Sequence, residues 1–101
     1  MIVPFSHVLA VSTLLFFIGA ACAASRRNLV MILVGVEVML NAAALAFVGA
    51  ALRWGDLDGQ AVVLFIMAVA AAEVSVGLAL VVCAGGRRGT VEADRFDALK
   101  G

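Results

Sequence analysis

Three long apolar runs, each able to cross a lipid bilayer, constrain this chain more than any other feature. They cover about residues 3–24, 28–52 and 60–84, and about 20 apolar residues suffice for a transmembrane helix. Of the 101 residues, 65% are hydrophobic, whereas a soluble domain is about 45–50% apolar. We therefore predict an all-α membrane protein in which residues 1–89 form a three-helix transmembrane domain and residues 90–101 form a polar tail.

The Lys and Arg residues lie in the connectors and the tail, and the two sides share them unevenly. Arg53 lies between the second and third runs, beside Asp56 and Asp58. The other side carries Arg26, Arg27, Arg87, Arg88, Arg95 and Lys100. Because cytoplasmic loops are enriched in Lys and Arg, we predict that the N-terminus lies outside and that the C-terminal tail is cytoplasmic.

Two acidic residues, Glu37 and Glu73, lie deep inside the apolar runs. An ionisable side chain at the bilayer centre costs roughly 2.5–3.5 kcal/mol, and such residues usually mark ion or proton pathways. A carboxyl group can both take up and release a proton. Two of them, each near the middle of its own run, predict a proton-relay site.

The depths of the two glutamates in the membrane can be estimated from the sequence. Glu37 follows Asn28 by nine residues, which places it about 14 Å from the cytoplasmic face. Glu73 precedes Gly85 by twelve residues, about 18 Å from the same face. Both depths are near the middle of a core about 30 Å thick. If the second and third helices pack with these faces together, the two carboxyl groups can serve one relay.

Asn41 and the pair Arg26–Arg27 are supporting candidates. Asn41 follows Glu37 by one turn on the same helix face, where a structural hydrogen bond between helices is at least as good an interpretation as a relay role. Arg26 and Arg27 lie in a short turn, where they can set topology, contact lipid phosphates or contact a specific partner. For the two glutamates, the alternative is a neutral, hydrogen-bonded acid with a structural role.

Several classes of function find no support in the sequence. His7, Cys22 and Cys83 are too few for a structural zinc site. The net charge is zero, and no basic stripe could follow the phosphates of a nucleic acid. The sequence shows no nucleophile constellation and no phosphate-binding loop. Three spans enclose a transport path poorly, so we infer that the chain works within a larger membrane complex.

Two stretches of the sequence resemble a known family. The stretch RRNLVMILVGVEVMLNAAAL, residues 26–45, contains Arg-Arg-Asn-Leu, then Gly35-x-Glu37, then Leu-Asn-Ala ending at Ala42. The stretch of residues 58–80 begins with Asp-Gly-Gln and contains Ala-Ala-Glu ending at Glu73. They resemble the second and third helices of subunit K of NADH–quinone oxidoreductase, the respiratory complex I. The resemblance covers about residues 3–85.

The resemblance implies a multi-pass inner-membrane subunit of this translocase, placed between the quinone-reducing region and the antiporter-like pumping subunits. Glu37 and Glu73 would belong to a chain of charged residues along the middle of the membrane. Flavin, iron–sulfur clusters and the NADH site belong to other subunits, so we expect no cofactor in this chain. The expected partners are the other membrane-arm subunits and the lipid bilayer, and protons are the only small substrate.

Three alternatives stay open. A multi-subunit cation/proton antiporter contains a small three-helix subunit related to subunit K, and co-purifying flavin and iron–sulfur proteins would separate the two. A small multidrug exporter is similar in length but typically has four helices and one membrane glutamate, so it fits poorly. A purely structural role predicts that changing either glutamate to glutamine is harmless.

Overall fold

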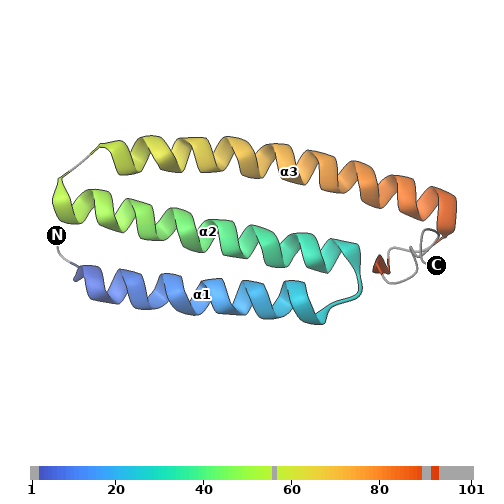
Figure 1. Ribbon diagram of the computed structural model, residues 1–101, viewed down its shortest axis with the longest axis horizontal. Coiled ribbons are helices and arrows are strands. Elements are labelled where there is room, and N and C mark those ends of the chain that lie inside the picture. The colour runs from blue at the N-terminus through green and yellow to red at the C-terminus, as the bar shows by residue number, and fades with distance from the viewer. Residues whose placement is uncertain (1–2, 56, 90–91, 94–101) are drawn as a thin grey trace, which may run out of the picture.

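The computed structural model describes residues 3–55, 57–89 and 92–93, which contain three long helices (Figure 1). The helices are α1 (Phe5–Ser25), α2 (Leu29–Trp54) and α3 (Asp58–Arg88). In Figure 1, α2 lies between α1 and α3, and neighbouring helices run in opposite directions. All three are long and apolar enough to cross a membrane. The predicted fold class of three transmembrane helices is confirmed.

Local sequence signals set the two ends of α2. The side-chain Oδ1 of Asn28 accepts a hydrogen bond from the backbone N–H of Val30 at 2.8 Å and caps α2. At the other end of α2, Gly55 has a φ of 63°, a left-handed conformation that favours glycine. Both α1 and α2 begin and end within two residues of their predicted bounds.

The third helix is longer than the sequence predicts. It begins at Asp58 and continues through Gly85 and Gly86 to Arg88. Each glycine costs about 1 kcal/mol relative to alanine inside a helix, and α3 tolerates both. The helix ends at Gly89, whose φ is 67° and whose N–H donates to the carbonyl oxygen of Gly85 at 3.2 Å. The predicted end near residue 84 is therefore wrong by about one turn.

The predicted tail, residues 90–101, is mostly outside the described residues. Glu92 and Ala93 are described, whereas Arg95 and Lys100, which entered the charge count, are not. Asp56, in the connector between α2 and α3, also lies outside them.

Small residues form the interior, and large apolar residues form the surface. The buried residues include Ser12, Gly19, Gly35, Ala42, Gly49, Ala51, Gly77 and Ala84. Phe17, Leu64, Phe65 and Val82 are 64–74% exposed. Monomeric soluble proteins rarely expose apolar surface so extensively. The outer surface is suited to lipid chains or to neighbouring membrane helices.

Glycines bring α1 and α2 close together. A Cβ atom at Gly19 would lie 2.7 Å from the carbonyl oxygen of Gly35, and one at Gly35 would lie 2.6 Å from the backbone nitrogen of Ala23. Further along the pair, a Cβ at Gly49 would lie 2.7 Å from the side chain of Val8. In membranes, small residues allow this close approach of two helices. The two helices therefore form a tightly packed pair.

Two glycine contacts set the register of α3 against α2. A Cβ at Gly59 would lie 2.9 Å from the Cβ of Ala51, and one at Gly77 would overlap the side chain of Leu33. Because the helices are antiparallel, each step forward along α3 matches one step back along α2. Glu73, four residues before Gly77, therefore lies level with the residue four after Leu33, which is Glu37.

Candidate functional site

Glu37 lies in the middle of α2, on the side that faces α3. Gly35 and Ala42 face α1 and, at about 100° per residue, lie about 160° and about 140° around the helix from Glu37. The Glu37 side chain is half-buried. Its Oε1 atom is buried and has no hydrogen-bond partner among the described residues. Buried polar atoms are normally hydrogen-bonded, so the described part of this chain does not by itself satisfy the carboxyl group.

Glu73 lies on α3 and is exposed. It lines a groove of about 520 Å³ between α2 and α3. The other residues that line the groove are apolar: Leu33, Val36, Val69, Ala72, Val76, Gly77 and Leu80. Because a carboxyl group is costly in such surroundings at the middle of a membrane, the groove favours contact with water or with a polar group of a neighbouring protein.

The two glutamates lie level with each other but on opposite sides of the seam between α2 and α3. Around the axis of α2, Glu37 lies about 40° from Leu33, which contacts α3. Around the axis of α3, Glu73 lies about 40° from Gly77, which contacts α2. Because both helices are right-handed and run in opposite directions, these equal rotations carry the side chains to opposite sides of the seam. The groove agrees with this geometry, since Glu73 and Val36 line it and Glu37 does not.

The shared depth agrees with the estimate from the sequence, in which the two depths differ by about 4–5 Å. A direct proton transfer would need the two carboxyl groups to face each other. The helix geometry does not place them face to face. A proton that moves from one glutamate to the other must cross the seam, by way of water or of a side chain that changes its rotamer.

Asn41 is exposed on α2, one turn beyond Glu37. It lies on the Glu37 side of the seam, where Val30 and Val34 are also exposed. Its amide group is therefore available to a neighbouring helix on that side. Both predicted roles, an interhelical hydrogen bond and a relay, fit this position.

Arg26 and Arg27 lie in the turn between α1 and α2, and both are exposed. The N–H of Arg26 donates to the carbonyl oxygen of Cys22 at 3.2 Å and closes the end of α1. Arg27 and Glu37 are ten residues apart, about 15 Å along the helix. The structure therefore does not bring the two arginines to the glutamates, and any role of theirs lies at the end of the bundle.

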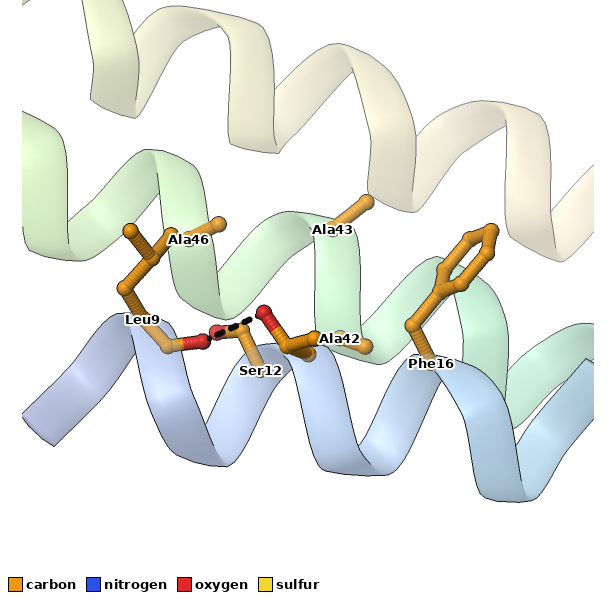
Figure 2. A pocket seen from close by; sticks show the side chains of 7 residues that line it. Leu9, Ser12, Phe16, Ala42, Ala43 and Ala46 are labelled. Atoms are coloured by element: carbon orange, nitrogen blue, oxygen red, sulfur yellow. Dashed lines mark hydrogen bonds between the residues drawn. The ribbon is translucent and has the colours of Figure 1, made fainter.

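Sequence reasoning missed Ser12, which is only 4% exposed and lies where α1 approaches α2. Figure 2 shows it beside Ala42, in a hollow of about 190 Å³ that is also lined by Leu9, Thr13, Phe16, Ala43 and Ala46. The Oγ of Ser12 has no hydrogen-bond partner among the described residues. The signal in the sequence is the spacing of seven between Ser12 and Gly19, two small residues on one face of α1.

Two other hydroxyl groups in the helices indicate how that of Ser12 can be satisfied. Thr13 donates to the carbonyl oxygen of Leu9 at 2.8 Å, and Ser75 donates to that of Ala71 at 3.0 Å. Both bonds join a hydroxyl to the carbonyl one turn earlier, a common arrangement in helices. The same arrangement would let the Ser12 hydroxyl donate to the carbonyl oxygen of Val8, so this buried group does not require a ligand.

The described residues contain no group of three or more His, Cys, Asp or Glu side chains that could hold a metal ion. Cys22 and Cys83 are both free thiols. The Sγ of Cys22 lies 3.5 Å from the carbonyl oxygen of Met31 and donates to it across the turn between α1 and α2. Within the part of the chain that is described, Glu37 and Glu73 are the carboxyl groups that lie in the middle of the apolar helices.

Comparisons with known proteins agree with this picture. Residues 7–101 match the family model of the NADH-ubiquinone/plastoquinone oxidoreductase chain 4L. NADH-quinone oxidoreductase subunit K 2 of Syntrophobacter fumaroxidans is 56% identical over 99% of this chain and 88% of its own length. Subunit K 1 of Geobacter metallireducens is 57% identical over the full length of both chains. Subunit K of Solidesulfovibrio magneticus is 58% identical over 98% of this chain and 96% of its own. This multi-pass inner-membrane protein therefore belongs to the subunit K (chain 4L) family of the NADH-quinone oxidoreductases.

Proposed function

We propose that this subunit of NADH-quinone oxidoreductase relays protons, or a shift of charge, through Glu37 and Glu73. The single observation that carries the proposal is the shared depth of two carboxyl groups, each in the middle of an apolar helix. Ionisable residues so placed usually belong to ion or proton pathways. The enzyme would pump protons, and the subunit would connect its quinone-reducing region with its antiporter-like subunits.

The positions of the two carboxyl groups suggest a relay across the subunit. Glu37 opens toward one side of the seam between α2 and α3, and Glu73 opens into the groove on the other side. Each carboxyl group can exchange a proton with a different neighbour, and the seam is the step between them. In this arrangement, the buried Oε1 of Glu37 is well placed to meet a water molecule or a polar side chain inside the seam.

The partners of the chain are other subunits of NADH-quinone oxidoreductase. We further propose that these are subunits of the membrane arm, that lipid covers the remaining surface, and that the chain itself holds no cofactor. The three relatives compared above are named as subunit K of NADH-quinone oxidoreductase. These names favour that enzyme over the multi-subunit cation/proton antiporter.

The orientation in the membrane is part of the proposal. Arg26, Arg27 and the C-terminal end of α3 lie at one end of the bundle, and Arg53 lies at the other (Figure 1). At the Arg53 end, the rings of Phe5 and Trp54 are 5.3 Å apart, and Arg53 lies 5.9 Å from the centre of the Trp54 ring. Because Trp is enriched at membrane interfaces and Lys and Arg on the cytoplasmic side, we place the Arg53 end outside.

Chemical labelling tests the orientation. In a variant without native cysteines, a membrane-impermeant thiol reagent should reach a cysteine at residue 57 only from outside. The same reagent should reach a cysteine at residue 89 only from the cytoplasmic side. The opposite pattern would overturn the orientation while leaving the shared depth of the glutamates unchanged.

Changing Glu37 to glutamine tests the relay. Glu37→Gln keeps the size and hydrogen bonding of the side chain but removes the titratable proton. We expect normal assembly, a loss of at least about tenfold in quinone-linked NADH oxidation, and a matching loss of proton pumping in vesicles. NADH oxidation by an artificial acceptor that bypasses the membrane arm should remain.

Two control variants sharpen this experiment. Glu37→Asp keeps a carboxyl group and should retain partial activity. Asn41→Glu combined with Glu37→Gln restores a carboxyl group one turn away on the same side of the seam, and it should recover part of the lost turnover. Wild-type turnover and pumping in Glu37→Gln, measured per assembled enzyme, would leave only a structural role for Glu37.

A further inference from the structure

The C-terminal tail returns to the turn between α1 and α2. The backbone N–H of Ala93 donates to the carbonyl oxygen of Arg27 at 2.6 Å. Next to this bond, Glu92 forms an antiparallel β-bridge with Asn28. Glu92 and Ala93 are both half-buried. These two residues, which we call the strap, thus join a segment that follows α3 to the turn that precedes α2.

The length of α3 explains why the tail can make this contact. Because the helix continues to Arg88, it extends past the ends of α1 and α2 (Figure 1). A Cβ atom at Gly85 or Gly86 would meet nothing within 4 Å, so this part of α3 is open on those sides. The helix ends at Gly89, and Glu92 and Ala93 lie against the turn between α1 and α2.

The strap makes a connection that the helices do not make by themselves. In Figure 1, α1 and α3 lie on opposite sides of α2, and α3 packs mainly against α2. The groove beside Glu73 shows that the packing of α3 on α2 is partly open. A link between the far end of α3 and the turn at Arg27 therefore restricts α3 at the end that extends past α2.

Charge also favours the contact. The turn carries Arg26 and Arg27, and the strap contributes the acidic residue Glu92 beside them. The hydrogen bond to Arg27 and the β-bridge to Asn28 both join main-chain atoms. They therefore set the path of the turn itself. The strap therefore controls the position of the two arginines as well as the end of α3.

We propose that Glu92 and Ala93 form a docked strap that holds the Arg26–Arg27 turn in place and fixes the cytoplasmic end of α3 to the α1–α2 pair. The strap is an internal brace of the subunit. It does not depend on the relay role of the glutamates, and its test uses a structural measurement.

Disulfide trapping tests the position of the strap in the assembled enzyme in native membranes. Asn28→Cys and Glu92→Cys are combined in a background in which Cys22 and Cys83 are serine. Directly opposed residues of an antiparallel pair have Cβ atoms about 4.5–5.5 Å apart, near the range in which a disulfide forms. The control pair is Asn28→Cys with Asp97→Cys, five residues further along the tail.

Under mild oxidation, we expect the first pair to give several times the cross-link yield of the control pair. Ala93→Pro removes the N–H that donates to Arg27, and in the first pair it should lower the yield by about threefold to tenfold, the effect of one hydrogen bond. Ala93→Gly keeps the N–H and should leave the yield nearly unchanged.

Equal yields from the two cysteine pairs would overturn the proposal, because a tail without a fixed position would meet both partners alike. An unchanged yield in Ala93→Pro would also overturn it. If Ala93→Pro prevents assembly, the comparison between the two pairs still decides the position of the strap, because both keep Ala93. Neither result bears on Glu37 or Glu73.

Discussion

The two seams of this small bundle are built differently. Between α1 and α2, glycines bring backbone against backbone, and even a hydroxyl group, that of Ser12, is enclosed. Between α2 and α3, Gly59 approaches α2 closely near one end, but Gly77 meets only the side chain of Leu33, and a groove of about 520 Å³ remains beside that contact. Both ionisable residues of the membrane interior, Glu37 and Glu73, face this second seam.

The difference separates structure from function within the subunit. Apolar burial gives little drive for helix association inside a membrane, so close packing of small residues has to supply it. The α1–α2 pair achieves that packing and gives α2 a fixed support. The α2–α3 seam is less closely packed and leaves space in which water, a neighbouring side chain or a moving proton can be accommodated.

The largest effect is expected from filling the α1–α2 seam. In Gly35→Leu, the new side chain has no room, because its Cβ would lie 2.6 Å from the nitrogen of Ala23 and 2.7 Å from the carbonyl oxygen of Gly19. Overpacking a well-packed interior costs about 1–3 kcal/mol, and backbone atoms yield less than side chains. We expect most of the subunit to be lost from the assembled enzyme, as measured by quantitative immunoblotting of membranes.

The control for this prediction is Gly85→Leu, at a glycine whose Cβ would meet nothing within 4 Å. It should assemble like the wild type, because leucine also has a higher helix propensity than glycine. If Gly35→Leu assembled as well as Gly85→Leu, the contrast between a closed and an open seam would fail.

The next effect concerns the two carboxyl groups of the α2–α3 seam. Glu73→Gln should assemble and should lose quinone-linked turnover, but less than Glu37→Gln. Glu73 opens into a groove where water can take over part of its role, whereas Oε1 of Glu37 is buried. The measurement is turnover and membrane potential in vesicles, per assembled enzyme. A larger loss in Glu73→Gln would reverse the assigned order of importance.

The smallest effect is expected from Gly77→Ala, at the contact of α3 with Leu33 of α2. The added Cβ meets the flexible end of the Leu33 side chain, which can turn away at a cost of about 1 kcal/mol. We expect normal assembly and a reduction in turnover of less than about fivefold, the equilibrium equivalent of that cost. In the double variant Leu33→Ala/Gly77→Ala, the two substitutions should be strongly non-additive, because they act on one contact.

Much of the architecture could be predicted from residue patterns alone. The apolar runs predicted three helices and placed the ends of α1 and α2 within two residues of where the structure has them. The common depth of Glu37 and Glu73 also followed, since a fixed rise per residue and a known membrane thickness convert sequence position into depth. The extension of α3 past Gly85 was missed, because glycine in a helix is unfavourable but tolerated.

The sequence by itself therefore determined the number of helices and the depth of the two carboxyl groups, which depend on distances along one chain. Only the tertiary structure decided on which side of the α2–α3 seam each carboxyl group lies, because that depends on the rotation of one helix against another. The contacts of Gly77 with Leu33 and of Gly59 with Ala51 set this rotation. The return of Glu92 and Ala93 to the turn at Arg27 was likewise decided by folding, because backbone hydrogen bonds between distant residues leave no pattern in the side chains.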